Sequence, residues 1–215
     1  MNLFVKKTIK IGLLDLLCPH HCKGCGALGS VFCERCKKYL NEQRDLVGMV
    51  RKTSQQIENL YAVGWREGLL ARLVEDYKYQ SVRSLKSGLV DLLDEVLPYW
   101  DKTVIVPLPT ISRHVRERGF DHTWELAREL GRRRGWEVRR LLGRARNTVQ
   151  VGAKAGERQE MAQKAYKLVQ EAKKDENYLL LDDVWTTGAS MLAAEKLLKQ
   201  AGANEVRAVV IAISN

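Results

Sequence analysis

Apolar positions recur at helical spacing in four stretches of the chain. Residues 69–79 (LLARLVEDYKY) and 84–97 (SLKSGLVDLLDEVL) place apolar side chains three and four positions apart, and Pro98 closes the second stretch. Residues 122–134 (HTWELARELGRRR) and 188–202 (GASMLAAEKLLKQAG) repeat this spacing and end at or before a glycine. The pattern predicts four amphipathic helices and a mostly helical segment between about residues 46 and 100.

Short continuous apolar runs separate the helical stretches in the second half of the chain. Residues 103–109 (TVIVPLP), 178–184 (YLLLDDV) and 206–213 (VRAVVIAI) predict buried strands, and 136–142 (WEVRRLL) is compatible with another. Strands that alternate with helices indicate an α/β fold with a parallel sheet. Residues 143–175 are polar and weakly patterned before they become helix-like, which is typical of a functional loop.

The cysteines form a cluster near the start of the chain. All five lie before residue 37: Cys18, Cys22, Cys25, Cys33 and Cys36. A disulfide framework would spread its cysteines over the chain, so the cluster indicates metal binding. Two Cys-x-x-Cys knuckles, Cys22/Cys25 and Cys33/Cys36, supply four thiolates for a closed structural zinc site. A redox role for one pair is an alternative, and Cys18, His20 or His21 could replace one knuckle ligand.

Composition and charge limit the class of protein. The chain has 215 residues, of which 45% are apolar and 29% are charged, as in a globular protein and not in a disordered one. The cysteine cluster suggests a zinc-binding module at residues 1–45 and a larger domain at 46–215. The net charge is 36 − 26 = +10. Such an excess of positive charge favours a polyanionic partner such as a phosphate, a nucleotide or a nucleic acid.

The first residues resemble a targeting signal only briefly. Lysines precede an apolar run in MNLFVKKTIKIGLLDLLC, but Asp15 interrupts the run and no small-residue cleavage site follows. We expect a short amphipathic helix here. No apolar stretch approaches the roughly 18 residues that a membrane span needs. The sequence therefore predicts a cytoplasmic protein without a membrane span.

Residues 178–190 (YLLLDDVWTTGAS) combine features of a ribose-phosphate site. A buried strand is followed by Asp182 and Asp183, then by a small, hydroxyl-rich turn and a helix. Backbone N–H groups and hydroxyls at a helix N-terminus bind anions, and Gly188 permits close approach of the backbone to a phosphate. The two carboxylates suit hydroxyl groups or a metal beside that phosphate. A ligand with both a 5′-phosphate and a ribose diol satisfies both halves.

The same residues resemble the phosphoribosyl pyrophosphate (PRPP) signature of type I phosphoribosyltransferases at all 13 positions, with Ser190 where Thr is more usual. The resemblance implies that Asp182 and Asp183 bind the ribose hydroxyls. It further implies that the following turn holds the 5′-phosphate, through Thr186, Thr187, Gly188, Ala189 and Ser190.

The chain as a whole resembles the ComF family. The resemblance rests on the cysteine knuckles, VIVPLP (104–109), RHVRERGF (113–120), NTVQ (147–150) and the PRPP signature. It departs from the family at Asp121–His122, where Asn-Gln or Asn-His is commoner, and after Gln150, where ERQEM replaces the usual Arg-x-x-Asn. It implies a type I phosphoribosyltransferase-like parallel sheet flanked by helices, with an N-terminal four-cysteine zinc module. It also implies Mg²⁺ bound with PRPP and a role in DNA uptake during natural transformation, with single-stranded DNA and a competence helicase or other uptake proteins as partners.

An arginine-rich stretch offers further anion-binding residues. Arg116 and Arg118 follow the strand at 103–109 and could stabilise a leaving pyrophosphate, so we assign them to the catalytic group with Asp182 and Asp183. A candidate nucleic-acid surface comprises Arg132, Arg133, Arg134, Arg139 and Arg140. Two other functions stay open: an active phosphoribosyltransferase on an unidentified acceptor, and a non-catalytic PRPP-binding adaptor. Lys78 is either a ligand-facing or a surface lysine.

Overall fold

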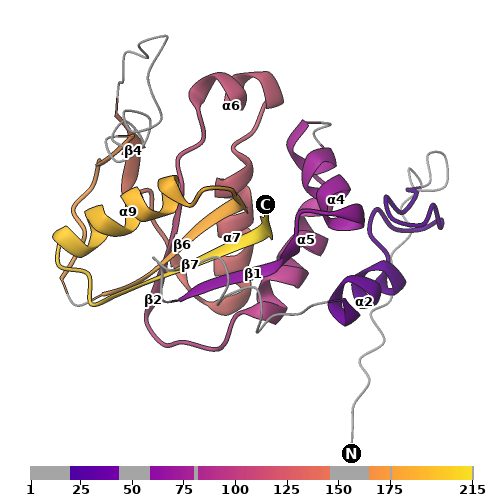
Figure 1. Ribbon diagram of the computed structural model, residues 1–215, viewed down its shortest axis with the longest axis horizontal. Helices are drawn as coiled ribbons and strands as arrows, with labels where there is room; N and C mark the ends of the chain where they lie inside the picture. Colours follow the sequence, from indigo (N-terminus) through magenta and orange to yellow (C-terminus); the bar gives the residue numbers. More distant parts are fainter. Residues whose placement is uncertain (1–19, 44–58, 80–81, 146–164, 175, 215) are drawn as a thin grey trace, which may run out of the picture.

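A computed structural model describes residues 20–43, 59–79, 82–145, 165–174 and 176–214, and Figure 1 shows its elements. In chain order they are α2 (Glu34–Glu42), β1 (Leu60–Trp65), α4 (Gly68–Tyr79), α5 (Leu85–Val96), β2 (Thr103–Pro107), α6 (Ser112–Arg118), α7 (His122–Arg134), β3 (Glu137–Val138), β4 (Leu142–Arg144), β5 (Tyr166–Leu168), β6 (Asn177–Trp185), α9 (Ala189–Gln200) and β7 (Glu205–Ile213).

Five strands form a parallel sheet in the order β1-β7-β6-β2-β3. The central strand β6 pairs with β2 through Val104 opposite Tyr178, and with β7 through Leu180 opposite Ala208. β6 has a paired strand on each side and an apolar layer on each face, which explains its continuous apolar run. The strands β4 and β5 form a separate antiparallel pair.

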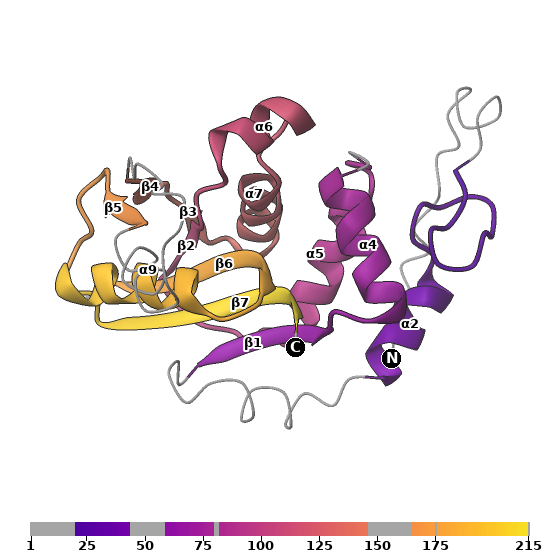
Figure 2. The same cartoon turned by 45° about the horizontal axis from the view of Figure 1, so that its top comes forward.

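The sheet separates two apolar layers. Leu179 and Leu181 of β6 pack in one cluster with α4, α5 and α7, whereas Tyr178 and Leu180 pack in another with α9 and the β4–β5 pair. Alternate residues of a strand point to opposite faces, so the two clusters follow directly from the strand geometry. Figure 2 shows α9 and the β4–β5 pair at one end of the molecule and α2 at the other.

The N-terminal module packs directly on the helical layer. Phe32 and Leu40 belong to the same apolar cluster as α5. Phe32 fits against Gly88 so closely that a Cβ atom there would lie 2.5 Å from its ring. Lys37 forms an ion pair with Asp91 of α5. The described part of the module, residues 20–43, therefore shares its core with the larger domain.

The four predicted helices and the three predicted strands are confirmed within a few residues. The expectation of a mostly helical segment between residues 46 and 100 was wrong at β1, an edge strand that pairs with β7. Residues 136–142 do not form one strand but contain β3 and the start of β4. The predicted helix at the chain start lies outside the described residues. Within the described part, no helix is long and apolar enough to cross a membrane.

Candidate functional site

A cavity of about 210 Å³ lies at the carboxyl ends of β2 and β6. Ligands of open parallel sheets bind at this edge, where loops leave the strands. The cavity is enclosed by the residues after β2, by α6, by the first residue of α7, by the end of α4, by the β4–β5 pair and by the first turn of α9. Its polar and charged lining residues are Lys78, Thr110, His114, Arg118, His122, Arg144, Tyr166, Asp182, Asp183 and Ser190.

Asp183 is the most strongly held acid of the cavity. Its Oδ2 lies 2.7 Å from Lys78 Nζ of α4 and 2.5 Å from His122 Nε2 of α7, and only 6% of its side chain is exposed. Burial alone would raise the pKa of Asp183. The hydrogen bond from His122 and the charge of Lys78 more than offset burial and hold this pKa well below its usual value. Asp183 therefore carries a fixed negative charge.

Asp182 has the opposite electrostatic setting. It follows Tyr178 and Leu180 on the α9 face of β6, and its Oδ1 accepts a hydrogen bond from the backbone N–H of Asp183. Burial and the neighbouring charge of Asp183 raise the pKa of Asp182 well above its usual value. The two adjacent acids thus leave β6 in different directions, and one is held charged while the other resists ionisation.

The turn after β6 begins α9 as the phosphate motif predicted. Thr186 and Thr187 are exposed, and Gly188 adopts φ +75° at the N-cap of α9. A Cβ atom at Gly188 would lie 2.1 Å from the Trp185 ring, so glycine is required by both conformation and space. The backbone N–H groups of the first turn point away from the helix body. Ser190 lines the cavity together with Asp182, whereas Thr186, Thr187, Gly188 and Ala189 are not among the lining residues.

Three permanent cations line the cavity: Lys78, Arg118 and Arg144. Arg118 of α6 lies 3.1 Å from His122 Nδ1 and 5.0 Å from the centre of the Tyr79 ring. Arg144 of β4 donates to the carbonyl of Pro109 and stacks on Tyr166 of β5. Arg116, which the sequence grouped with Arg118, is exposed and does not line the cavity.

His122 and Tyr166 are site residues that the sequence reasoning did not assign. Tyr166 is buried, contacts Ser190, and has a pKa raised mainly by burial. It lies in a three-residue strand within the polar segment 143–175, where no pattern marks it. The unusual Asp121–His122 pair was visible as a family departure, and that was the one signal at His122. Lys78 lines the cavity and pairs with Asp183, with 17% of its side chain exposed, so the ligand-facing alternative stays a prediction.

The predicted nucleic-acid arginines lie mostly in contacts within the chain. Arg133 pairs with Asp91 and Glu129, Arg134 pairs with Asp94, and Arg139 pairs with Glu176. The pairs of Arg133 with Asp91 and of Arg134 with Asp94 connect α7 to α5. The pair of Arg139 with Glu176 connects the residue after β3 to the residue before β6. The two more exposed members are Arg132, which pairs with Glu129, and Arg140, which stacks on Trp124. The nucleic-acid assignment stays a prediction.

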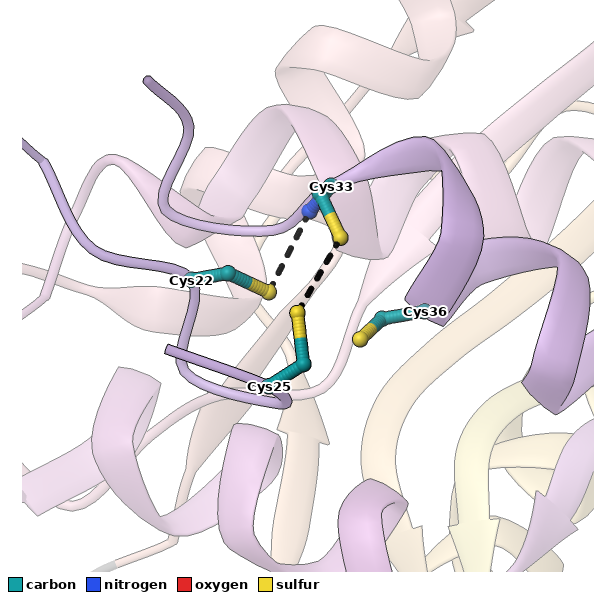
Figure 3. A group of neighbouring side chains, drawn as sticks. All are labelled: Cys22, Cys25, Cys33 and Cys36. Carbon is teal, nitrogen blue, oxygen red and sulfur yellow. Dashed lines mark hydrogen bonds between the residues drawn. The ribbon is translucent and has the colours of Figure 1, made fainter. Parts of the chain in front are cut away.

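The four knuckle cysteines converge, as Figure 3 shows. The Sγ atoms of Cys22, Cys25, Cys33 and Cys36 all lie within 4.8 Å of one another, and those of Cys25 and Cys33 are 3.6 Å apart. These spacings fit four sulfur atoms around one metal ion with bonds of about 2.3 Å. Cys18 lies outside the described residues, and His21 contacts the Gly26 carbonyl.

Neighbouring donor groups favour the thiolate form of Cys22 and Cys25, whereas burial raises the pKa of Cys36. Cys22 Sγ accepts from the N–H groups of Gly24 and Cys33 at 3.4 Å each. The backbone N–H of Ala27 and then the Arg35 side chain lower the pKa of Cys25 to about 6. Thiolate character is what a metal ligand needs, so the donor set fits a tetrahedral ion such as Zn²⁺.

Part of the chain is similar to a known protein family. Residues 125–215, from α7 to β7, match the phosphoribosyl transferase domain. Comparison with curated proteins gives no significant match. The fold class predicted from the sequence is confirmed: a phosphoribosyltransferase-like parallel sheet flanked by helices, with a four-cysteine cluster on its N-terminal side.

Several solved structures resemble the chain at low identity. The glutamine PRPP amidotransferase from B. subtilis is 16% identical with a TM-score of 0.45, over 64% of this chain and 30% of that one. The UMP synthase of Leishmania donovani is 20% identical with a TM-score of 0.39, over 66% and 24%. The adenine phosphoribosyltransferase of Saccharomyces cerevisiae is 18% identical with a TM-score of 0.37, over 69% of each chain. The chain thus spans under a third of the first two.

Proposed function

We propose that this protein binds PRPP together with Mg²⁺ in the cavity at the carboxyl ends of β2 and β6. One observation carries the proposal: two strand-end acids, Ser190 in the first turn of α9 and three cations line the same cavity. A ribose with phosphates at both ends needs this combination. Hydroxyls require acceptors, and phosphates require cations and N–H donors.

Each part of the cavity matches a part of the ligand. The turn Thr186–Ser190 would hold the 5′-phosphate at the N-terminus of α9. Asp182 and Asp183 would accept from the ribose hydroxyls. Lys78, Arg118 and Arg144 would face the pyrophosphate, and the carboxylate oxygens are donors of the kind that Mg²⁺ prefers. Bound Mg²⁺ would supply charge neutralisation of the pyrophosphate.

Calorimetric titration with PRPP, with and without Mg²⁺, tests this function. The wild type should bind, and the Asp182→Asn/Asp183→Asn variant should lose binding while it keeps its fold and its metal. A folded wild type that does not bind PRPP would refute the proposal. Ribose 5-phosphate and pyrophosphate serve as partial ligands that report on the two halves of the cavity separately.

Transfer of the phosphoribosyl group is the second candidate, and the three cations favour it. Pyrophosphate would leave C1 of the ribose as the bond to the acceptor forms, and the acceptor's proton would pass to solvent or to pyrophosphate. Lys78, Arg118 and Arg144 line the cavity, and in this proposal they would stabilise the leaving charge. Acceptor-dependent release of pyrophosphate, lost in Asp183→Asn, would support transfer. No release across purine, pyrimidine and amine acceptors would leave a binding protein or adaptor.

A role in DNA uptake rests on the resemblance to the ComF family. The net charge of +10 is compatible with single-stranded DNA, and with Arg132 and Arg140 as the exposed members of the candidate surface. Replacement of both by alanine should weaken DNA binding and flatten its salt dependence. Unchanged binding would exclude this surface. A competence helicase and a cytoplasmic location belong to the same proposal.

A further inference from the structure

His122 joins the two halves of the cavity, and this contact suggests a role beyond packing. Its side chain is 6% exposed, at the first position of α7. Nε2 meets Asp183 on the ribose side, and Nδ1 meets Arg118 on the side assigned to pyrophosphate. The Tyr77 hydroxyl also donates to the His122 carbonyl at 3.2 Å, which fixes the start of α7. One imidazole thus touches a group from each half.

The partners determine which nitrogen carries the proton. A guanidinium can only donate, so Nδ1 accepts from Arg118 with its lone pair. Nε2 then carries the hydrogen and lies 2.5 Å from Asp183 Oδ2, which is an acceptor only. The result is a directed chain of polar contacts that runs from Arg118 through the ring to Asp183. Lys78 meets the same carboxylate oxygen of Asp183 at its far end.

Such a chain transmits a change at one end to the other. Donation from Arg118 withdraws charge from the ring and strengthens the Nε2–H donor, which holds Asp183 more tightly. A pyrophosphate that draws Arg118 away weakens this donor and leaves Asp183 a better acceptor for ribose hydroxyls. The Thr110 hydroxyl lies 3.5 Å from Nδ1 and can take the place of Arg118. The imidazole Nδ1 therefore has a second partner when Arg118 moves towards pyrophosphate.

We propose that His122 is a positioning residue that couples the pyrophosphate half of the cavity to the ribose half. The inference rests on the proposed PRPP site and adds a specific consequence. Pyrophosphate should tighten the binding of ribose 5-phosphate, and by reciprocity ribose 5-phosphate should tighten the binding of pyrophosphate by the same factor. The factor depends on the imidazole and not merely on the presence of both sites.

The test measures this coupling by calorimetry in the full-length, metal-loaded protein. Ribose 5-phosphate is titrated with and without saturating pyrophosphate, at constant Mg²⁺, in wild type, His122→Gln and His122→Leu. The ratio of the two affinities should be about fivefold larger in wild type than in His122→Leu, a coupling at the low end of those common between linked sites. The glutamine amide can accept and donate in the same directions, so His122→Gln should retain most of the ratio.

A second variant distinguishes loss of the His122 contacts from loss of the fold. Arg118→Met removes the donor at the other end of the chain, from a helix in which none of the seven residues is buried. It should lower the coupling ratio as His122→Leu does. Equal ratios in wild type, His122→Leu and Arg118→Met would overturn the inference and leave PRPP binding intact. A wild type that binds neither PRPP nor its fragments would overturn the proposed function itself.

Discussion

Gly188 carries two constraints at once, because its backbone is left-handed and the Trp185 ring occupies the space of a side chain. Gly188→Ala should therefore destabilise the fold by about 2–5 kcal/mol, the sum of a left-handed alanine and the displacement of a buried ring. Gly135→Ala is the matched control, since Gly135 has φ +69° and open space around its Cβ position. Its cost should be about 1–2 kcal/mol. Urea unfolding measures both, and equal costs would contradict the packing argument.

The arginines around the cavity differ in what they face. Arg118→Ala and Arg144→Ala each remove a cation from the cavity lining and should weaken PRPP binding about tenfold. Arg116→Ala changes an exposed residue only two positions from Arg118 and should alter the affinity less than twofold. Calorimetric affinities separate these outcomes. A large effect at Arg116 would support the catalytic role predicted for it from the sequence and would place the pyrophosphate outside the described cavity.

Ion pairs of Glu129 with Arg132 and Arg133 stabilise the end of α7. Hydrogen bonds from Arg132 and then Arg133 lower the pKa of Glu129 to about 2, below the ordinary value of 4.5. The lowered pKa means that the stabilising contribution is complete above about pH 4.5 and is lost as the pH falls towards 2. Glu129→Gln should therefore cost about 1 kcal/mol at pH 7 and progressively less in acid.

Unfolding by urea at several pH values between 7 and 3 tests this expectation. The exposed Glu67, between β1 and α4, supplies a control substitution, Glu67→Gln, which should have little effect at any of these pH values. A stability gap between wild type and Glu129→Gln that does not change with pH would show that the Glu129 contribution is not ionic.

Elements with many buried positions were predictable from the sequence, and short or partner-dependent ones were not. α5, α7 and β6 place apolar residues at regular spacing because their neighbours cover a full face or both faces. β1 is an edge strand that depends on β7, and β4 and β5 have three residues each. α6 was not predicted because a helix without buried residues leaves no apolar period.

The same distinction applies to the site. Asp182, Asp183 and the turn to Ser190 are contiguous in the chain, so their local pattern revealed them. His122 and Tyr166 reach the cavity from separate elements, and only tertiary packing brings them to the acids. Local sequence therefore revealed the half of the cavity that contains Asp182, Asp183 and Ser190. The opposite wall, which α4, α6, α7 and β4 build, needed the fold.

At the scale of the whole molecule, the cysteine module and the α/β domain behave as one packed body in the described residues. Cys22 and Cys36 lie in the same apolar cluster as α4, α5 and α7. A Cβ atom at Gly24 would lie 2.6 Å from Cys36 Sγ and 3.2 Å from Leu69. The first knuckle is therefore packed between Cys36 and the start of α4, the helix that carries Lys78 to Asp183.

Metal removal should consequently destabilise more than the module. Chelation at neutral pH would free four sulfur atoms, of which those of Cys22 and Cys36 belong to buried residues, and the loss should reach α4 and α5 through their shared core. We expect one calorimetric transition in both forms, lowered by about 10 °C without metal, since a loss of a few kcal/mol shifts a chain of this size by that amount. Cys25→Ser, at the exposed ligand, should reproduce the shift and leave the protein insensitive to chelator. Two separate transitions, with the larger one unmoved by chelator, would instead establish residues 1–45 as an independent domain.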